Sequence, residues 1–369
     1  MRPTQSRASF GYTRLESTTV GSGAAELIWH LLARLKSSDS SSVTCRIDAV
    51  FDRTVHLSLS GPEKHNIPSL IVLGSRDVRE GPLLITFDTP HGFSFDRLID
   101  KHAQSTTVQL RAQTKPPQEL QFHFGQSVIL DVDTNIVPML PAAGGIYERI
   151  PLYQFTADGP CVKTHVRLCK TLETEGIEDG LGWFDDLGRY HENRPTDELE
   201  SLADSVVEQL TGELVDTGSE TNRGVEPNDH RRRCVRADVP AVLAGLVGHG
   251  PGATPSGDDF LAGLVLTLRL VEDDAIAYRA RELSRRLTIL SVEKSTAMSA
   301  ALLEQATLGR AAQPVVNCLE TLLAPEIDVE TAYRNIAELK TIGHTSGSDT
   351  LAGVLTATTV VLPLLAERR

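Results

Sequence analysis

Residues 256–263 read SGDDFLAG and open the apolar stretch 260–271, FLAGLVLTLRLV. A second copy, SGSDTLAG at residues 346–353, opens the apolar stretch 351–365, LAGVLTATTVVLPLL. Each copy follows a loop rich in Gly, Thr and Ser, so each predicts a helix that starts directly after a loop. Both stretches are shorter than the roughly 20 residues of a membrane span, and each carries Thr, Arg or Pro. They therefore predict two buried helices.

The rest of the C-terminal half also has helical periodicity. Thr196 is expected to cap a helix, with Asp197 and Glu198 in its first turn. Apolar residues recur at helical spacing in two later segments: Ile276, Ala280, Leu283, Leu287 and Leu290, and then Val329, Ala332, Ile336 and Leu339. Residues 196–369 are therefore predicted to form an all-α bundle that carries both Ser-Gly-x-Asp loops.

The N-terminal half has the alternation of β-strands. Apolar residues recur at every second position at Ile47, Ala49 and Phe51, and again at Val55, Leu57 and Leu59. Asp52-Arg53 between the two segments predicts a tight hairpin. Further short strands are expected at 70–73, 83–87, 107–111, 120–124 and 127–132. Strands spaced this closely favour an antiparallel barrel or sandwich over βαβ units. The predicted fold class is α+β, with this domain preceding the helical bundle.

Composition shifts give the expected boundaries. Residues 1–22 are polar and predicted to be loosely ordered, and 24–36 predict a short helix. The β-rich domain is placed at 23–155. Residues 156–195, with many Gly and Pro, are interpreted as the junction to the helical domain at 196–369.

Bulk properties exclude several classes of function. The net charge of −13 argues against broad binding to nucleic acid or to an anionic membrane. The cysteine count of 5 is odd and includes no C-x-x-C pair, which argues against a disulfide framework and against a Cys-based zinc site. The N-terminus lacks the apolar core of a signal peptide. We therefore expect a cytoplasmic protein with reduced thiols.

The two loops carry the candidate chemistry. A helix start offers backbone N–H groups beside hydroxyls, which suits a phosphate, a carboxylate or a carbamoyl oxygen. Thr254-Pro255 resembles an N-cap followed by Pro at the first helical position. The first loop is not a P-loop, because Asp258 stands where the lysine is needed. The predicted ligand-binding residues are Gly250, Gly252, Thr254, Ser256, Gly257, Asp258, Thr345, Ser346 and Gly347.

The catalytic candidates are His344, Asp259 and Asp349. His344 could transfer a proton or hold an oxyanion. The aspartates could bind Mg²⁺ together with Asp258, hydrogen-bond an amide or amine, or only cap helix starts. These alternatives stay open, and no metal ligand or cofactor is assigned. If the Ala-Gly pairs at 262–263 and 352–353 let the helices approach closely, both loops lie at one end of the bundle.

The phrase GPGATPSGDDFLAG at 250–263, with GHTSGSDTLAG at 343–353, resembles the signatures of the family of the AllH subunit of oxamate carbamoyltransferase. The segment 298–309 is similar to that family's middle helix, and the likeness covers roughly 240–357. Ser348 departs from the pattern, which has a bulky residue there.

The resemblance implies carbamoyl transfer in purine or allantoin catabolism, in a multi-subunit complex. Oxalurate and phosphate would give oxamate and carbamoyl phosphate, so the implied partners are such small anions and other carbamoyltransferase subunits. The leading hypothesis is an enzyme subunit whose loops bind the anionic substrate. The alternative is a non-catalytic subunit that binds a metabolite or regulates the complex.

Overall fold

The computed structural model describes residues 13–37, 42–59, 69–78, 81–98, 107–112, 119–124, 128–133, 152–156, 168–169, 172, 179–191, 197–212, 239–324 and 328–368. The chain divides into two compact units. The first comprises Met1–Pro62 and Ser69–Leu140, and the second comprises Glu63–Pro68 and Pro141–Arg369. Residues 212–233 are polar and end in His230-Arg231-Arg232-Arg233, a composition that predicts an exposed loop. Apart from Gly212, this segment lies outside the described residues.

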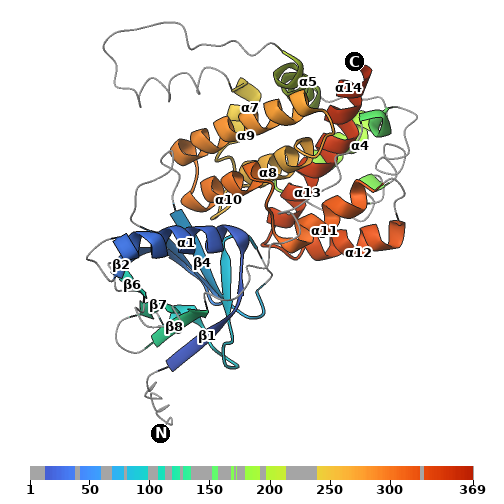
Figure 1. The fold of residues 1–369 in the computed structure, drawn as a ribbon. Helices are drawn as coiled ribbons and strands as arrows, with labels where there is room; N and C mark the ends of the chain where they lie inside the picture. Colours follow the sequence, from blue (N-terminus) through green and yellow to red (C-terminus); the bar gives the residue numbers. More distant parts are fainter. Residues whose placement is uncertain are drawn as a thin grey trace, which may run out of the picture. The chain divides into compact units, whose positions relative to one another are not determined.

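The first unit is a closed barrel of strands in the order β1-β5-β4-β3-β2-β6-β7-β8 (Figure 1). The strands are β1 (Thr13–Val20), β2 (Ser42–Val50), β3 (Thr54–Leu59), β4 (Ser69–Ser75), β5 (Leu84–Phe87), β6 (Thr107–Ala112), β7 (Glu119–Phe124) and β8 (Val128–Asp133). The hairpin at Asp52-Arg53 is confirmed, because the Phe51 N–H donates to the Thr54 oxygen at 2.8 Å and Val50 pairs with Val55.

Two features of the barrel differ from the sequence prediction. Strand β1 pairs with β8 in parallel, and β4 pairs with β5 in parallel, so the barrel is mixed rather than wholly antiparallel. Thr13–Val20 forms β1, so the prediction of a loosely ordered segment at 1–22 is wrong for these residues. Alternation of side chains does not distinguish parallel from antiparallel neighbours, and β1 is too polar to show a strand pattern.

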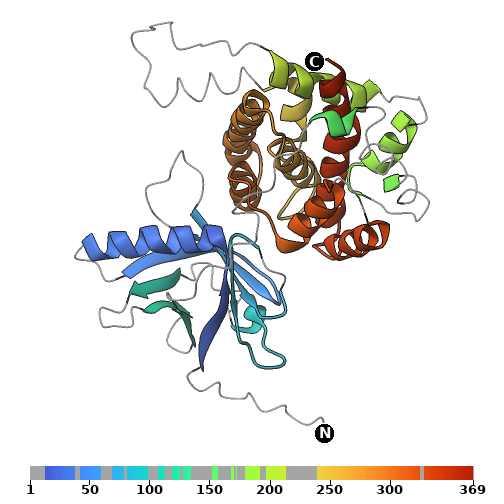
Figure 2. The same ribbon diagram turned by 45° about the vertical axis from the view of Figure 1, so that its right-hand side comes forward.

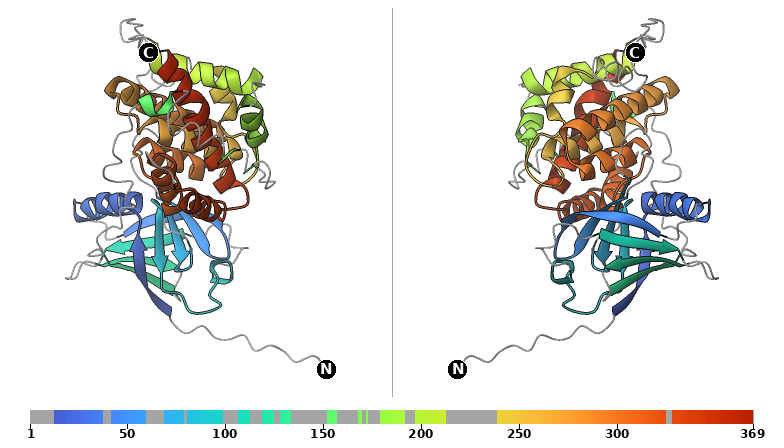
Figure 3. Two further views of the ribbon diagram at one scale, coloured as in Figure 1. Left: turned by 90° about the vertical axis from the view of Figure 1, so that its right-hand side faces the viewer. Right: turned by 90° about the vertical axis from the view of Figure 1, so that its left-hand side faces the viewer.

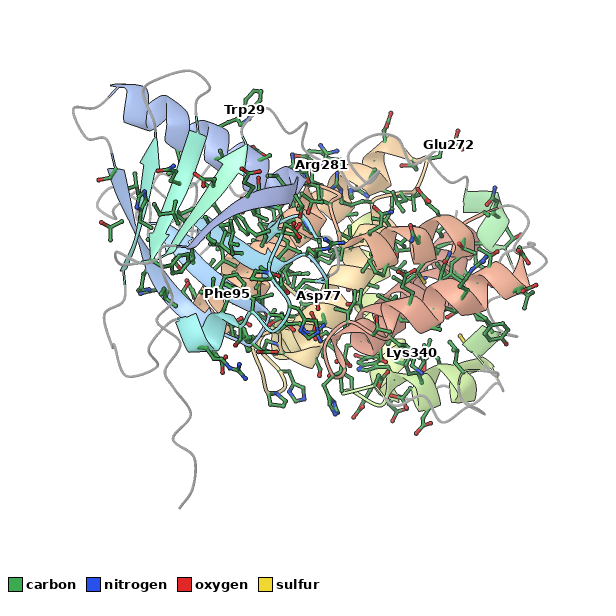
Figure 4. All side chains as sticks on the ribbon, turned by 90° about the horizontal axis from the view of Figure 1, so that it is seen from below. Trp29, Asp77, Phe95, Glu272, Arg281 and Lys340 are labelled. Carbon is green, nitrogen blue, oxygen red and sulfur yellow. The ribbon has the colours of Figure 1, made fainter. Side chains whose placement is uncertain are left out.

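Helix α1 (Ser22–Ser37) packs its apolar side on the barrel, and its Ala24, Ile28 and Leu31 join the barrel core. Trp29 lies on the opposite side of α1, where it is 67% exposed and projects away from the helix (Figure 4). The short helix α2 (Phe95–Leu98) places Phe95 in the same core, where it is fully buried.

The second unit is helical, which confirms the α+β class. It contains η3 (Leu152–Phe155), α4 (Trp183–His191), α5 (Asp197–Thr211), α7 (Ala241–Leu246), α8 (Ser256–Leu268), α9 (Asp274–Lys294), α10 (Ala297–Thr307), α11 (Gln313–Leu322), α12 (Val329–Leu339), α13 (Ser346–Thr356), the π-helical turn η5 (Ala357–Val361) and α14 (Leu362–Glu367). Asp185-Asp186, which the sequence suggests is a turn, lies in α4.

Helices α8 and α13 form the centre of this unit, with the other helices around them (Figures 1 and 2). All residues of α8 are buried except Ala262, and all of α13 from Gly347 onward are buried. The helix continues through η5 and α14 (Figure 3). Within the described residues, Ser346–Glu367 is the one helix long and apolar enough to cross a membrane, with mean hydropathy 1.6, but 78% of that window is buried inside the protein. A core helix has the same properties.

Candidate functional site: two loops at the paired helix starts

The two copies of the motif pack against each other through their glycines. A Cβ on Gly263 would lie 2.1 Å from the Thr350 oxygen, and a Cβ on Gly353 would lie 2.0 Å from the Phe260 oxygen. The two contacts correspond to each other in the two copies of the motif. Gly263 of the first copy faces Thr350 of the second, and Gly353 of the second copy faces Phe260 of the first. The backbones of α8 and α13 therefore touch in an approximately two-fold arrangement, which only glycine allows at these positions.

The glycine at the second position of each motif lets the start of the helix pack closely against the backbone of the preceding helix. A Cβ on Gly257 would lie 2.0 Å from the Leu246 oxygen of α7, and a Cβ on Gly347 would lie 2.0 Å from the Leu339 oxygen of α12. Each motif is thus the junction of a tight helix–loop–helix unit. Gly250 and Gly252 in the first loop have φ of 109° and 101°, the left-handed conformations expected of glycine there.

A hydroxyl pair joins the two loops. The Thr254 Oγ1 and the Ser346 Oγ lie 2.9 Å apart. Thr254 is not the N-cap predicted from the sequence, because α8 begins at Ser256 with Pro255 in the cap position and no side-chain cap. The two loops therefore lie together at one end of the helix pair, the arrangement required for a shared site.

We expect Thr254→Val to lower the free energy of unfolding by about 1 kcal/mol, since one part-buried hydrogen bond is lost. In a double-mutant cycle with Ser346→Ala, the two changes should couple by roughly 0.5–1.5 kcal/mol, measured by denaturant unfolding. Thr254→Val combined with the distant Thr321→Val is the control and should be additive. Additive behaviour of the first pair would mean that the hydroxyls do not bridge the loops.

Most of the helix-start N–H groups are used within the loops. The Gly257 N–H donates to the His249 oxygen at 2.9 Å, and the N–H groups of Asp258 and Asp259 donate to the Pro255 oxygen. In the second copy, Gly347 donates to Ile342 and Asp349 to Thr345. These five N–H groups have carbonyl acceptors, so they are not the ones that would bind the anion expected at the helix starts.

Asp258 ties the first loop to the start of α10. Its Oδ1 accepts the Gly248 N–H at 3.1 Å, and its Oδ2 accepts the Ser295 hydroxyl. Burial raises the pKa of this carboxyl, and these hydrogen bonds oppose the increase. Thr296 strengthens the attachment by donating to the Ala253 oxygen at 2.5 Å. Ser348, the counterpart of Asp258, is buried.

Asp259 and Asp349 are the least satisfied polar groups at the site. Asp259 is 8% exposed and Asp349 is 0% exposed, and the Oδ2 atom of each is buried with no hydrogen-bond partner among the described residues. Burial raises the pKa of Asp259 to about 8, although the Ser346 and Thr254 hydroxyls lower it. A pKa of about 8 favours the neutral acid form of Asp259 at pH 7. Neither aspartate caps its own helix, so the capping alternative is wrong for both.

A third segment, missed in the sequence, lies against this pair. The Gly180 N–H donates to Asp349 Oδ1 at 2.6 Å, and a Cβ on Gly180 would lie 2.1 Å from the Ser256 Oγ. Asp179 caps α4 by accepting the Trp183 and Phe184 N–H groups. Burial, and then the charge of Asp349, raise the pKa of Asp179 to about 6.

The capping pattern before α4 could have indicated Asp179 as a helix cap. No local pattern links the adjacent Gly180 to Asp349, which lies 169 residues further along the chain. The stacking of Trp183 on Phe260, with ring centroids 4.7 Å apart, holds α4 beside α8.

The predicted site residues thus fall into two groups. His344, Gly250 and Gly252 are exposed on the loops, while Thr254, Thr345 and Ser346 are half-buried behind them. Ser256, Gly257, Asp258, Asp259, Gly347 and Asp349 form a buried floor. Within the described residues, no group of three or more His, Cys, Asp or Glu side chains could hold a metal ion.

Among known proteins, a family model matches the part of the chain that contains these loops. No solved structure matches the chain. The matched family segment, 246–358, covers less than half of the sequence but runs from the end of α7 into η5 and includes both motifs. This confirms the resemblance recognised in the sequence: residues 246–358 match the family model of the oxamate carbamoyltransferase subunit AllH.

Proposed function

We propose that this chain is a subunit of an oxamate carbamoyltransferase-like enzyme and binds a small anionic substrate at the paired loops. The observation that carries the proposal is the meeting of the two motifs of the matched segment, with Thr254 and Ser346 in hydrogen-bond contact. In this proposal the anion lies against the exposed loop residues around Gly250–Gly252 and His344, since the buried N–H groups already have acceptors.

The proposed reaction transfers the carbamoyl group of oxalurate to phosphate, or is a closely related carbamoyl or acyl transfer. A phosphate oxygen attacks the carbamoyl carbon, the bond from that carbon to the ureido nitrogen breaks, and the nitrogen leaves as the amide of oxamate. The proton lost from hydrogen phosphate ends on that nitrogen, so atoms and charge balance. His344, exposed on the second loop, is the proposed carrier of this proton, while Asp259 and Asp349 position the loops and the substrate.

The proposed setting is cytoplasmic purine or allantoin catabolism, together with other carbamoyltransferase subunits. The family description names a subunit, which supports a multi-subunit complex. Cys45 and Cys318 are buried free cysteines, consistent with reduced thiols.

Ligand binding by the full chain tests the proposal first. Oxamate or carbamoyl phosphate at 100 times its Kd should stabilise the folded chain by about 2.7 kcal/mol, measured as a rise in Tm. Asp259→Ala should abolish the rise. A chain whose Tm is unaffected by either compound, or by phosphate, would contradict binding at these loops.

Turnover separates the catalytic subunit from the binding-only alternative. We expect oxalurate and phosphate to give carbamoyl phosphate with the purified chain or after its partner subunits are added. His344→Ala should lower kcat by roughly 10²–10⁴-fold, the usual contribution of a general acid or base. His91→Ala, an exposed histidine of the barrel unit, is the matched control and should leave kcat unchanged. Unchanged turnover in His344→Ala would favour a binding or regulatory role for this loop.

A further inference from the structure

The buried floor of the site has the wrong charge for the anionic end of a ligand. Burial is the main cause of the raised pKa of Asp179 and of Asp259, and the charge of the neighbouring Asp349 raises both further. Within the described residues, no ion pair joins any of the three to a basic side chain. A carboxylate or phosphate placed here would be repelled.

Two oxygen atoms on this floor lack the partner that buried polar atoms normally have. Asp349 Oδ2 and Asp259 Oδ2 are both buried and accept no hydrogen bond within the described part of the chain. Leaving a buried polar oxygen without a partner is costly, most of all for a carboxylate, so each of these atoms calls for a partner that the described residues do not supply.

The structure also shows which kind of donor suits Asp349. Its other oxygen, Oδ1, accepts the amide N–H of Gly180 at 2.6 Å. Gly180 itself is exposed, so this side of Asp349 lies close to the protein surface. A ligand that enters beside Gly180 could donate an amide N–H to Asp349 Oδ2, as Gly180 donates its N–H to Oδ1.

We propose that the Asp259–Asp349 pair recognises the N–H-bearing end of the substrate, a carbamoyl, ureido or primary amide group, through the unpartnered Oδ2 atoms. This inference rests on the proposed function and gives the substrate an orientation. The amide end faces the buried floor, and the anionic end faces the exposed loops around Gly250 and His344. Asp349 accepts the amide N–H, and Asp259, as a neutral acid, can donate to the adjacent carbonyl oxygen.

Oxamate and oxalate form a matched pair of probes, because they differ only in an amide group against a carboxylate. Their affinities for the full chain are measured by calorimetry at pH 7 in the presence of EDTA, so that no divalent cation bridges ligand and protein. We expect oxamate to bind at least tenfold more tightly, since oxalate replaces a hydrogen bond to a carboxylate by a like-charge contact.

Two variants assign the preference to individual oxygens. Asp349→Asn supplies an amide donor in place of the acceptor, so the preference for oxamate should fall to within about threefold or reverse. Asp259→Asn retains a neutral group that can donate, so the preference should persist. If Asp349→Asn does not fold, as judged by circular dichroism, the relative affinities of oxamate and oxalate for the unaltered chain still test the proposed amide contact.

The outcomes separate this inference from the function on which it rests. If oxalate binds as tightly as oxamate, or if oxamate binds only after Mg²⁺ is restored, the amide contact is wrong while the anion site stands. If neither compound binds, the proposed function itself fails.

Discussion

Gly353→Ala is expected to lower the free energy of unfolding by about 3 kcal/mol, at the upper end of the usual cost of overpacking. The new Cβ would lie 2.0 Å from the Phe260 oxygen and 2.9 Å from the Leu264 nitrogen, which are backbone atoms of the facing helix. No change of side-chain rotamer relieves a contact with backbone, so α8 and α13 must move apart. The corresponding fall in Tm is roughly 6–12 °C.

Gly245→Ala is the control for this substitution. Gly245 is exposed in α7, and a Cβ there meets no atom within 4 Å. Alanine at this position should be neutral or stabilise by roughly 0.5–1 kcal/mol, because it reduces the entropy of the unfolded chain. Equal Tm values for the two variants would mean that α8 and α13 are not in backbone contact.

The separation of the helices also bears on function. The hydroxyl pair of Thr254 and Ser346 lies one turn beyond the glycine contact, at the starts of the same two helices. A Gly353→Ala chain that still folds should therefore bind oxamate more weakly than the unaltered chain, while Gly245→Ala should bind it normally. The repeated Ala-Gly of the motif thus has a structural role that is distinct from that of the Ser-Gly-x-Asp preceding it.

The elements that the sequence predicts best are those whose signal is local and periodic. The strands from β2 to β8 and the helices α9 and α12 lie where apolar alternation and helical spacing predict them, because a buried face imposes that spacing directly. The repeat also predicted the meeting of the two loops, since paired glycines on two buried helices favour close packing.

The unpredicted features depend on contacts between distant segments. The parallel pairing of β1 with β8 joins strands more than a hundred residues apart, and side-chain alternation carries no information about it. In the sequence, Asp179 and Gly180 have no feature that distinguishes them from other junction residues. Only the fold shows that they lie next to Asp349. The hydrogen bonds from the helix-start N–H groups to loop carbonyls also could not be predicted from the sequence. They depend on the direction of those carbonyls, which the glycine turns determine.

The pH dependence of stability should reveal the buried acid at the centre of the site. Burial raises the pKa of Asp259 to about 8 in the folded chain, against an ordinary value of 3.8 for an aspartate. Between these values the folded state holds a proton that the unfolded state has lost, so stability falls as pH rises through this window. Asparagine at position 259 does not titrate and should remove this loss.

The measurement is the free energy of unfolding of Asp259→Asn and of the unaltered chain at several pH values from 4 to 9. The variant should become relatively more stable by up to about 1.4 kcal/mol for each pH unit between about 4 and 8, and the difference should level off above 8. Asp328→Asn is the control, because the pKa of Asp328 is lowered whereas that of Asp259 is raised. Asp328 is a helix cap whose pKa the Thr331 hydroxyl lowers, so any effect should be confined to the acid side.

A difference between Asp259→Asn and the unaltered chain that does not change with pH would mean that Asp259 is ionised in the folded protein. In that case the carboxyl group could not donate to a substrate carbonyl, and Asp259 and Asp349 would face the ligand as two carboxylates. The pH-dependent difference is therefore expected to accompany the preference for oxamate over oxalate, because both follow from one neutral acid beside one unpartnered acceptor.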